Sequence, residues 1–477
     1  TLLERGAPAA DGTPAPLRSS GTLLLDKGSG AFEEFPYRLT DVAARITFAD
    51  DNLVVERLTG VGGEGATVSI TGRLDGLSTG AEIDLRIVCD DAPIDERLFN
   101  SFEDAPREAL GLLFDARAAA LLGESGLLPD ANAIVAQRQE LSRLGDDESV
   151  RAARERLERS IAAGPFALGG RCGFDMRVYS PPGFGQPVIV TGDVRIRDAG
   201  LVFGRFPYPL RLKEGGVRVL DEAIEIAGDG IRATTPAGGE LTVSGSVGIP
   251  RIPGRERGMR PLITITDRND ALNPALLAAI PHAGDEMPAG WPGTELAPAG
   301  ELLASLGLSG RVELDGLVDS DDAGRERFRF KVDFDDGTAA PDDAGRAELA
   351  ESGLPWPPEF KLEDCEASIL LTPERVVIER CTGRNGGGSI EAAGFAELEG
   401  PNRLVELRLD ALPIGRAFEG YLAADQAEAA ARFARYEPSG AIDGTVRREV
   451  TAAGAETRGT LTPRFIELTL DGSRVRG

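Results

Sequence analysis

Hydrophobic and polar residues alternate along much of the chain, and one alternating phrase occurs twice. Residues 53–60 read LVVERLTG, and residues 376–383, 323 positions later, read VVIERCTG. Alternation with a period of two predicts half-buried β-strands, and a long repeated pattern indicates one structural unit used several times. The match extends upstream without a gap, where the aligned residues are Leu39, Asp41, Ala44, Ile46 and Phe48 with Leu362, Asp364, Ala367, Ile369 and Leu371.

A weaker third copy and a fixed order of parts define the unit. Residues 206–219 (FPYPLRLKEGGVRV) echo residues 35–48 (FPYRLTDVAARITF). A copy opens with a strand pattern, continues through the repeated phrase and a glycine-rich bend, and stops at a phrase such as DDAPID before a helix-like run. We therefore predict several antiparallel strands closed by a short helix. The openings lie at 170–180, 309–318 and 439–446, the bends at 60–65, 237–241 and 384–389, and the stops at 90–95, 269–274 and 409–414.

The fold class expected from this order is mainly β: an elongated antiparallel repeat array, an open trough or β-groove, with short helices after each unit. Low-order inserts rich in Pro, Gly and acidic residues are expected at 250–260, 281–300 and 335–350. Both ends are interpreted as cut from a longer protein, and no signal peptide or apolar run of membrane-spanning length is present. The predicted parts are a linker-like segment (1–20), a first repeat (21–165) with a helical insert (101–165), a second repeat (166–305), a third (306–436) and the start of a truncated fourth (437–477).

Composition narrows the classes of function. The formal net charge is −26, from 52 basic and 78 acidic residues. Nucleic acid and anionic membrane surfaces attract clustered Lys and Arg, so this charge disfavours either as a partner. An acidic exterior is expected to keep a strand-rich molecule soluble.

Candidate catalytic and metal-binding groups are few. His282 is the sole histidine, so a His-based triad or a His-rich metal site is disfavoured. The glycine-rich bends lack a following GK[ST], and tight turns explain them better than a phosphate cradle. The acidic cluster Asp319, Asp321 and Asp322 lacks the ligand order and the closing Glu of an EF-hand loop. We expect a non-enzymatic protein without cofactor or metal, and we assign no catalytic residue.

Two of the four cysteines form a candidate pair. If Thr372-Pro373-Glu374 is a three-residue hairpin loop, Cys365 and Cys381 face each other across two strands. Two interpretations stay open. The pair forms a disulfide, which would imply an oxidising compartment, or it consists of two thiols on an apolar face. Copy one carries Val42 and Leu58 at these positions, so the site accepts an apolar pair.

The repeated phrase, the glycine bend and the stop before a short helix resemble the AsmA-like proteins of Gram-negative envelopes, the superfamily that includes TamB. The resemblance covers most of the chain except 101–165. It implies a curved sheet with an apolar lining, in a periplasmic segment of a protein held in the inner membrane by an anchor outside this sequence. It also implies phospholipid as a partner and lipid transport in outer-membrane biogenesis. The residues that carry it are Leu53–Gly60, Val376–Gly383, Asp91-Ala92-Pro93, Asp410-Ala411-Leu412-Pro413, Gly170, Gly310 and Gly440.

An apolar trough suits such a role, because each lipid methylene exposed to water costs about 0.8 kcal/mol. β-Strands readily form an apolar trough, because every second side chain points to the same side of the sheet. The alternative is a structural periplasmic spacer or scaffold whose strands enclose a dry β core. The predicted groove lining is Val42, Ala44, Ile46, Phe48, Val54 and Leu58 in copy one, and Ala367, Ile369, Leu371 and Val377 in copy three.

Overall fold

The fold is mainly β, with antiparallel strand pairing, which confirms the predicted fold class. The described part of the computed structural model contains 22 strands and two α-helices, and it divides into two compact units. The described residues are 2–6, 17–32, 35–94, 98, 101, 170–203, 206–248, 260–279, 303, 305–321, 326–351, 356, 360–398, 400–415, 431, 435–470 and 473–476.

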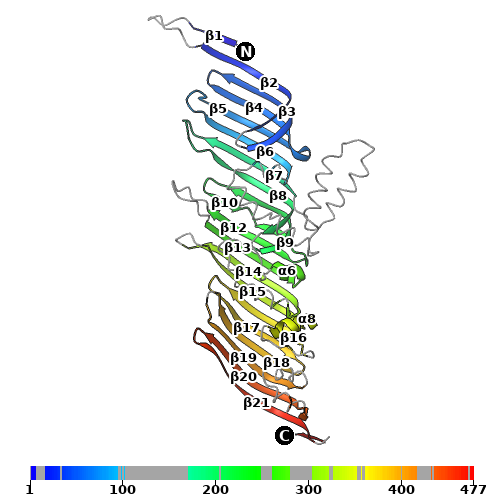
Figure 1. The fold of residues 1–477 in the computed structure, drawn as a ribbon. Coiled ribbons are helices and arrows are strands. Elements are labelled where there is room, and N and C mark those ends of the chain that lie inside the picture. The colour runs from blue at the N-terminus through cyan, green and yellow to red at the C-terminus, as the bar shows by residue number, and fades with distance from the viewer. Residues whose placement is uncertain are drawn as a thin grey trace, which may run out of the picture. The chain divides into compact units, whose positions relative to one another are not determined.

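Unit 1 comprises Thr1–Gly204, Pro209–Ala233 and Val243–Pro261. Its first seven strands each pair with the next strand in the chain, and Figure 1 shows β2 to β8 as successive neighbours. The elements are β1 (Leu2–Arg5), β2 (Leu17–Phe32), β3 (Phe35–Ala49), β4 (Asn52–Val61), η1 (Gly63–Gly65), β5 (Thr67–Asp75), β6 (Glu82–Pro93), β7 (Arg171–Ser180), β8 (Ile189–Phe203) and β10 (Ala223–Ile226).

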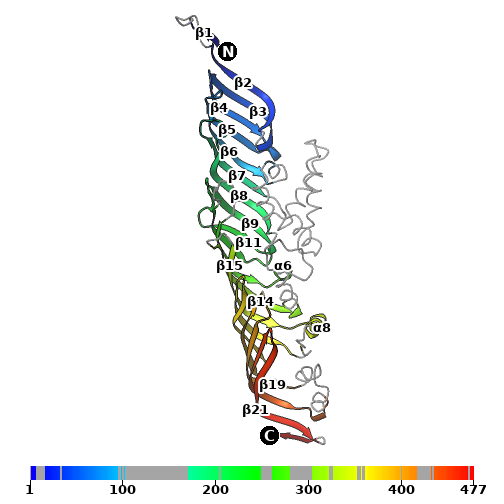
Figure 2. The same cartoon turned by 60° about the vertical axis from the view of Figure 1, so that its left-hand side comes forward.

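Unit 2 comprises Arg205–Tyr208, Thr234–Thr242 and Leu262–Gly477. Figure 2 shows its helices α6 (Pro274–Ala279) and α8 (Asp343–Glu351) on the same side of its strands. Four strands contribute residues to both units: β9 (Phe206–Val219), β11 (Ile231–Thr234), β12 (Glu240–Gly248) and β13 (Arg260–Ala271). The remaining strands are β14 (Leu308–Ser320), β15 (Glu326–Ala339), β16 (Leu362–Leu371), β17 (Arg375–Asn385), β18 (Gly388–Glu397), β19 (Arg403–Ile414), β20 (Ser439–Thr451), β21 (Gly454–Leu470) and β22 (Ser473–Arg476).

The repeated phrase forms the same hairpin in both units, β3–β4 and β16–β17. Each hairpin contains an extra residue at the aligned position of its second strand, Glu56 in one and Glu379 in the other. Such a bulge reverses which side chains lie on a given face beyond it. The repeat therefore extends from the sequence to the irregularities of the backbone.

The predicted pairing of Cys365 with Cys381 is wrong. The turn closes with Leu371 opposite Val376, one residue beyond the predicted register, and the bulge at Glu379 adds a second residue. Cys381 consequently lies opposite Ala367, two residues from Cys365 on the same face. Neither cysteine forms a disulfide. The thiol-pair interpretation is the one that agrees with the structure.

Two segments that were expected to lack regular secondary structure contain it. Residues 335–350 are not a low-order insert, because they contain the end of β15 and most of α8. Within the linker-like segment 1–20, β1 pairs with the first residues of β2. The helical insert at 101–165 and the inserts at 250–260 and 281–300 lie almost wholly outside the described residues. The division into repeat units stays a prediction.

A buried cluster lies at one end of the strands of unit 1. It includes Tyr37, Val68, Cys89, Leu98 and Leu212. The Tyr37 hydroxyl accepts a hydrogen bond from the Gly63 amide at 2.9 Å, which joins the 3-10 turn to β3. Among the described helices, none is both long and apolar enough to cross a membrane.

Candidate functional site

The strands of unit 1 have one apolar face. Residues directly opposite each other in an antiparallel pair point to the same side of a sheet, so the register defines two faces. Apolar residues and glycines fill the cross-strand rows of one face from β2 to β8. Two of these rows are Leu23, Ile46, Val55, Gly72, Leu85, Val178 and Val190, and Leu25, Ala44, Leu58, Ile70, Ile87, Met176 and Gly192.

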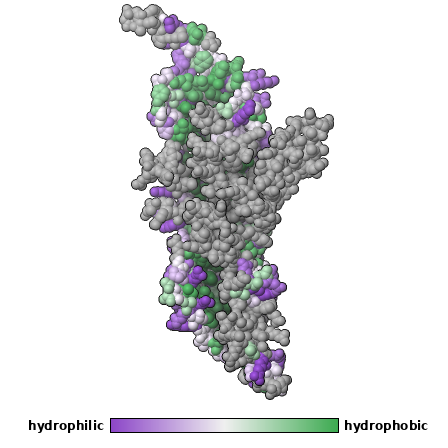
Figure 3. Space-filling model, viewed as in Figure 1, coloured by the Kyte–Doolittle hydropathy of each residue, from purple (hydrophilic) through white to green (hydrophobic). Residues whose placement is uncertain are grey.

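Parts of this face are open to solvent. The side chains of Leu23 and Leu25 on β2 are 55% and 43% exposed, and Val190 on β8 is 40% exposed. The rows between them are mostly partly buried, while full burial concentrates near the core cluster at Val68 and Cys89. Figure 3 shows hydrophobic residues gathered over the N-terminal strands of unit 1. Apolar surface on this scale normally marks a binding surface.

Unit 2 has an apolar face of the same kind. Its rows begin at β14 and reach β21. On this face the side chains of Val405 on β19 and Leu461 on β21 are 41% and 52% exposed. Figure 3 shows a second group of hydrophobic residues over strands of this unit. Two rows are Leu314, Val332, Ile369, Ile378, Gly394 and Val405, and Val312, Phe334, Ala367, Cys381, Ala392, Leu407 and Val446.

Eight of the ten predicted lining residues lie on these apolar faces. Val54 and Val377 do not, because they oppose Thr47 and Leu370 on the other face. Their places are taken by Val55 and Ile378. The eight residues on the apolar faces are Val42 and Ala44, which are buried, and Ile46, Phe48, Leu58, Ala367, Ile369 and Leu371, which are partly buried.

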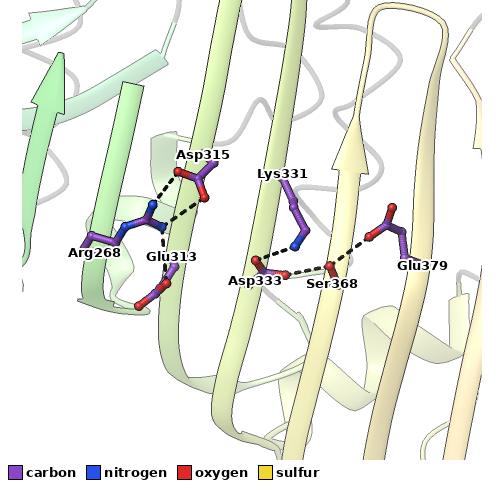
Figure 4. A network of polar contacts seen from close by, with 7 residues as sticks. All are labelled: Arg268, Glu313, Asp315, Lys331, Asp333, Ser368 and Glu379. Atoms are coloured by element: carbon purple, nitrogen blue, oxygen red, sulfur yellow. Dashed lines mark hydrogen bonds and ion pairs between the residues drawn. The ribbon is translucent and has the colours of Figure 1, made fainter. Parts of the chain in front are cut away.

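The opposite face of unit 2 carries a charged network, shown in Figure 4. Arg268 donates to Asp315 at 2.7 Å and to Glu313 at 3.4 Å. Ser368 donates to Asp333 at 2.7 Å. Burial alone would raise the pKa of Asp333, but the Ser368 hydrogen bond and the nearby Lys331 ammonium hold it below its usual value.

The corresponding face of unit 1 has a shallow depression whose charges are mutually paired. It is lined by side chains of β6, β7 and β8. Arg177 donates to Asp84 at 2.7 Å, and Arg86 donates to Asp175 at 2.8 Å. These hydrogen bonds lower the pKa of both carboxyl groups, so each carboxylate is held in its charged form by an arginine. The arrangement suits a stable, water-facing surface.

A buried polar cluster interrupts the apolar face of unit 2. Asp270 is fully buried and accepts hydrogen bonds from the Tyr208 hydroxyl at 2.6 Å and the Thr235 hydroxyl at 2.7 Å. Asp267 is 6% exposed, and its Oδ1 atom has no hydrogen-bond partner in the described structure. Burial, with the Asp270 charge beside it, raises the pKa of Asp267 to about 7.

Sequence patterning alone did not identify this cluster. Asp270 belongs to the stop phrase, and the backbone bulge at Asn269 turns it to the face where the other stops have Ala92 and Leu412. The alternation around it, ITITDRNDAL, is ordinary. The Asp at the second position of the stop phrase was the only signal, and other stops whose Asp residues form ion pairs share it, such as Asp91 with Arg171.

The described structure shows no catalytic or metal-binding arrangement at the other candidate residues. Asp319 pairs with Arg327 at 3.0 Å. Burial raises the pKa of the Cys365 thiol to about 11, which disfavours the reactive thiolate form at neutral pH. His282 and Asp322 lie outside the described residues. Among the residues that the structure does describe, no group of three or more His, Cys, Asp or Glu side chains is arranged to hold a metal ion.

Comparison with known proteins gives no match to a family model, to a curated protein or to a solved structure.

Proposed function

We propose that the apolar faces of the two units bind the acyl chains of phospholipids and shield them from water during transfer between the inner and outer membranes of a Gram-negative-type envelope. The supporting observation is the exposure of Leu23, Leu25, Val190, Val405 and Leu461 on faces whose rows are mostly apolar. In a spacer with a closed core these side chains would be sealed. The proposal places this chain in the periplasm and excludes catalysis from its role.

The rows suit a ligand that slides. Neighbouring strands lie about 4.8 Å apart, so apolar side chains recur at short, regular steps across the face. Each lipid methylene removed from water gains about 0.8 kcal/mol wherever it lies, and no single position dominates. Gly72 and Gly192 add no side chain to two of these rows. Such a surface supports movement better than tight binding at one site.

The spacer is the second candidate, and the buried cluster around Val68 and Cys89 favours it locally. The two functions differ in a direct measurement. We expect phospholipid to co-purify with the chain from a bacterial membrane extract and to be detected by mass spectrometry. We also expect the delipidated chain to take up a fluorescent acyl-labelled phospholipid. A folded chain that carries no lipid and takes up none would contradict the proposal and support the spacer.

A further inference from the structure

Two arginines stand on the apolar face of unit 2. Arg448 on β20 lies directly opposite Val405 on β19, and Arg403 lies two residues from Val405 on the same strand. The register therefore puts both arginines on the face that carries Leu407 and Val446. Diagonal neighbours of this kind have Cα atoms about 7–8 Å apart, within reach of a shared ligand for side chains as long as arginine.

These arginines differ from three well-paired arginines on the charged face. Arg268, Arg447 and Arg464 each contact two carboxylates. Arg403 and Arg448 are exposed, and neither side chain has an ion pair or a hydrogen bond to any residue in the described part of the chain. The protein has a formal net charge of −26, and these two cations lie on an apolar surface without an acidic partner, a setting that suits an anionic ligand.

The surface next to the pair fits an acyl chain. From the row of Arg448 and Val405, the same face continues through Leu407, Leu409 and Leu412 towards Ile442. Six residues of strand span about 20 Å at ~3.3 Å per residue. One leaflet of a bilayer has a hydrocarbon layer of about 15 Å, half the thickness of the core. One acyl layer therefore fits between the arginines and the buried end of these strands.

We propose that Arg403 and Arg448 bind the phosphate of a phospholipid headgroup whose acyl chains lie along β19 and β20. This inference rests on the proposed function, because it assigns the headgroup of the same ligand. Guanidinium groups form paired, charge-assisted hydrogen bonds to phosphate oxygens, and two of them fix both position and orientation. The apolar strip supplies the surface for the chains, and the arginines determine which end of the lipid lies at the strand tips.

The test compares two labelled lipids with the same acyl chains, phosphatidylglycerol and diacylglycerol, on the full chain at low salt. Wild type should bind phosphatidylglycerol at least about tenfold more tightly than diacylglycerol. The double variant Arg403→Gln/Arg448→Gln should lose that preference and bind diacylglycerol unchanged. Its control is Arg375→Gln/Arg408→Gln, which removes the same charge from exposed, unpaired arginines of the opposite face and should behave as wild type.

The outcomes separate the two proposals. If wild type binds both lipids equally, or if the double variant keeps the preference, the headgroup site is wrong while acyl binding stands. If wild type binds neither lipid, the proposed function fails and the headgroup site fails with it. Tight binding of inorganic phosphate alone, lost in the same double variant, would assign the arginines to a free anion and overturn the lipid assignment. Circular dichroism of each variant should match wild type, because the side chains of Arg403 and Arg448 make no polar contact to a described residue.

Discussion

Asp41 and Asp364, 323 residues apart, occupy the same left-handed bulge in β3 and β16, with φ values of 48° and 49°. In both hairpins the bulged residue and its successor lie against a glycine of the next strand, Gly60 or Gly383. Asp tolerates this conformation better than most residues because its side chain bonds locally. The repeat thus preserves a backbone feature that alternation of side chains does not require.

This feature predicts an asymmetric response to substitution at Asp364. Glycine adopts the left-handed conformation without strain, so Asp364→Gly should leave the free energy of unfolding within about 0.5 kcal/mol of wild type. A β-branched residue is strained there, and Asp364→Val should destabilise the chain by about 1–2 kcal/mol. Urea unfolding followed by circular dichroism measures both. Equal effects of the two substitutions would show that the bulge imposes no conformational demand.

A second prediction concerns close packing between β5 and β6. Gly72 has a φ of +146°, and a Cβ atom built there would lie 2.1 Å from the Asp84 carbonyl oxygen. Backbone strain and overpacking each cost about 1–3 kcal/mol, so Gly72→Ala should destabilise the chain by about 2–4 kcal/mol. Gly30→Ala is the control, because no atom lies within 4 Å of its ideal Cβ position. The same unfolding experiment should find the control neutral or slightly stabilised.

Alternation predicted the strands well, but it assigned faces correctly only as far as the first bulge. Each bulge shifts the register by one residue, so Val54 and Val377 were placed on the wrong face while Ile46 and Ile369 were right. A shift of two residues, from the turn and the Glu379 bulge together, left Cys365 and Cys381 on one face but not opposite each other. The sequence carries no local mark for Glu56 or Glu379 as bulged residues, because neither is a glycine or a turn former.

The polar cluster around Asp270 was missed for a related reason. Its hydrogen-bond donors are distant in the sequence: Tyr208 lies in β9, and Thr235 follows directly after β11. Only tertiary pairing brings them to Asp270. The unpaired Arg403 and Arg448 were equally hidden, since a register is needed to know which face they occupy. Long-range contacts, and not local pattern, define these candidate sites.

Three consecutive leucines on β2 provide a matched test of the acyl-binding face. Leu23 and Leu25 oppose Ile46 and Ala44 on the apolar face, while Leu24 opposes Arg45 on the other face. All three are exposed, at 55%, 43% and 69%, so an aspartate at any of them should cost little stability. Leu23→Asp/Leu25→Asp should weaken uptake of acyl-labelled phospholipid several-fold, and Leu24→Asp should not. Equal loss in both variants, or none in either, would argue against a role for this face.

The buried Asp267 predicts a pH dependence of stability. Its pKa is raised to about 7, first by burial and then by the Asp270 carboxylate, while the unfolded chain has an ordinary aspartate near 4. The folded state therefore binds one proton more than the unfolded state between these values. Stability from this group is fully present below about pH 4 and is lost as the pH rises through about 7. Three polar groups surround Asp267 and Asp270. They are the Tyr208 hydroxyl from β9, the Thr235 hydroxyl from the segment after β11, and the Arg268 guanidinium from β13.

The variant Asp267→Asn isolates this effect, because asparagine has the shape of the protonated acid and no charge at any pH. Between pH 5 and pH 8.5 wild type should lose stability relative to the variant, by at most about 3 kcal/mol for the two pH units below the raised pKa. Urea midpoints at a series of pH values measure the difference. Ion pairs such as Asp84 with Arg177 are common to both proteins and cancel in it. Parallel curves for wild type and variant would mean that Asp267 is charged in the folded protein, and that its burial is relieved in some other way.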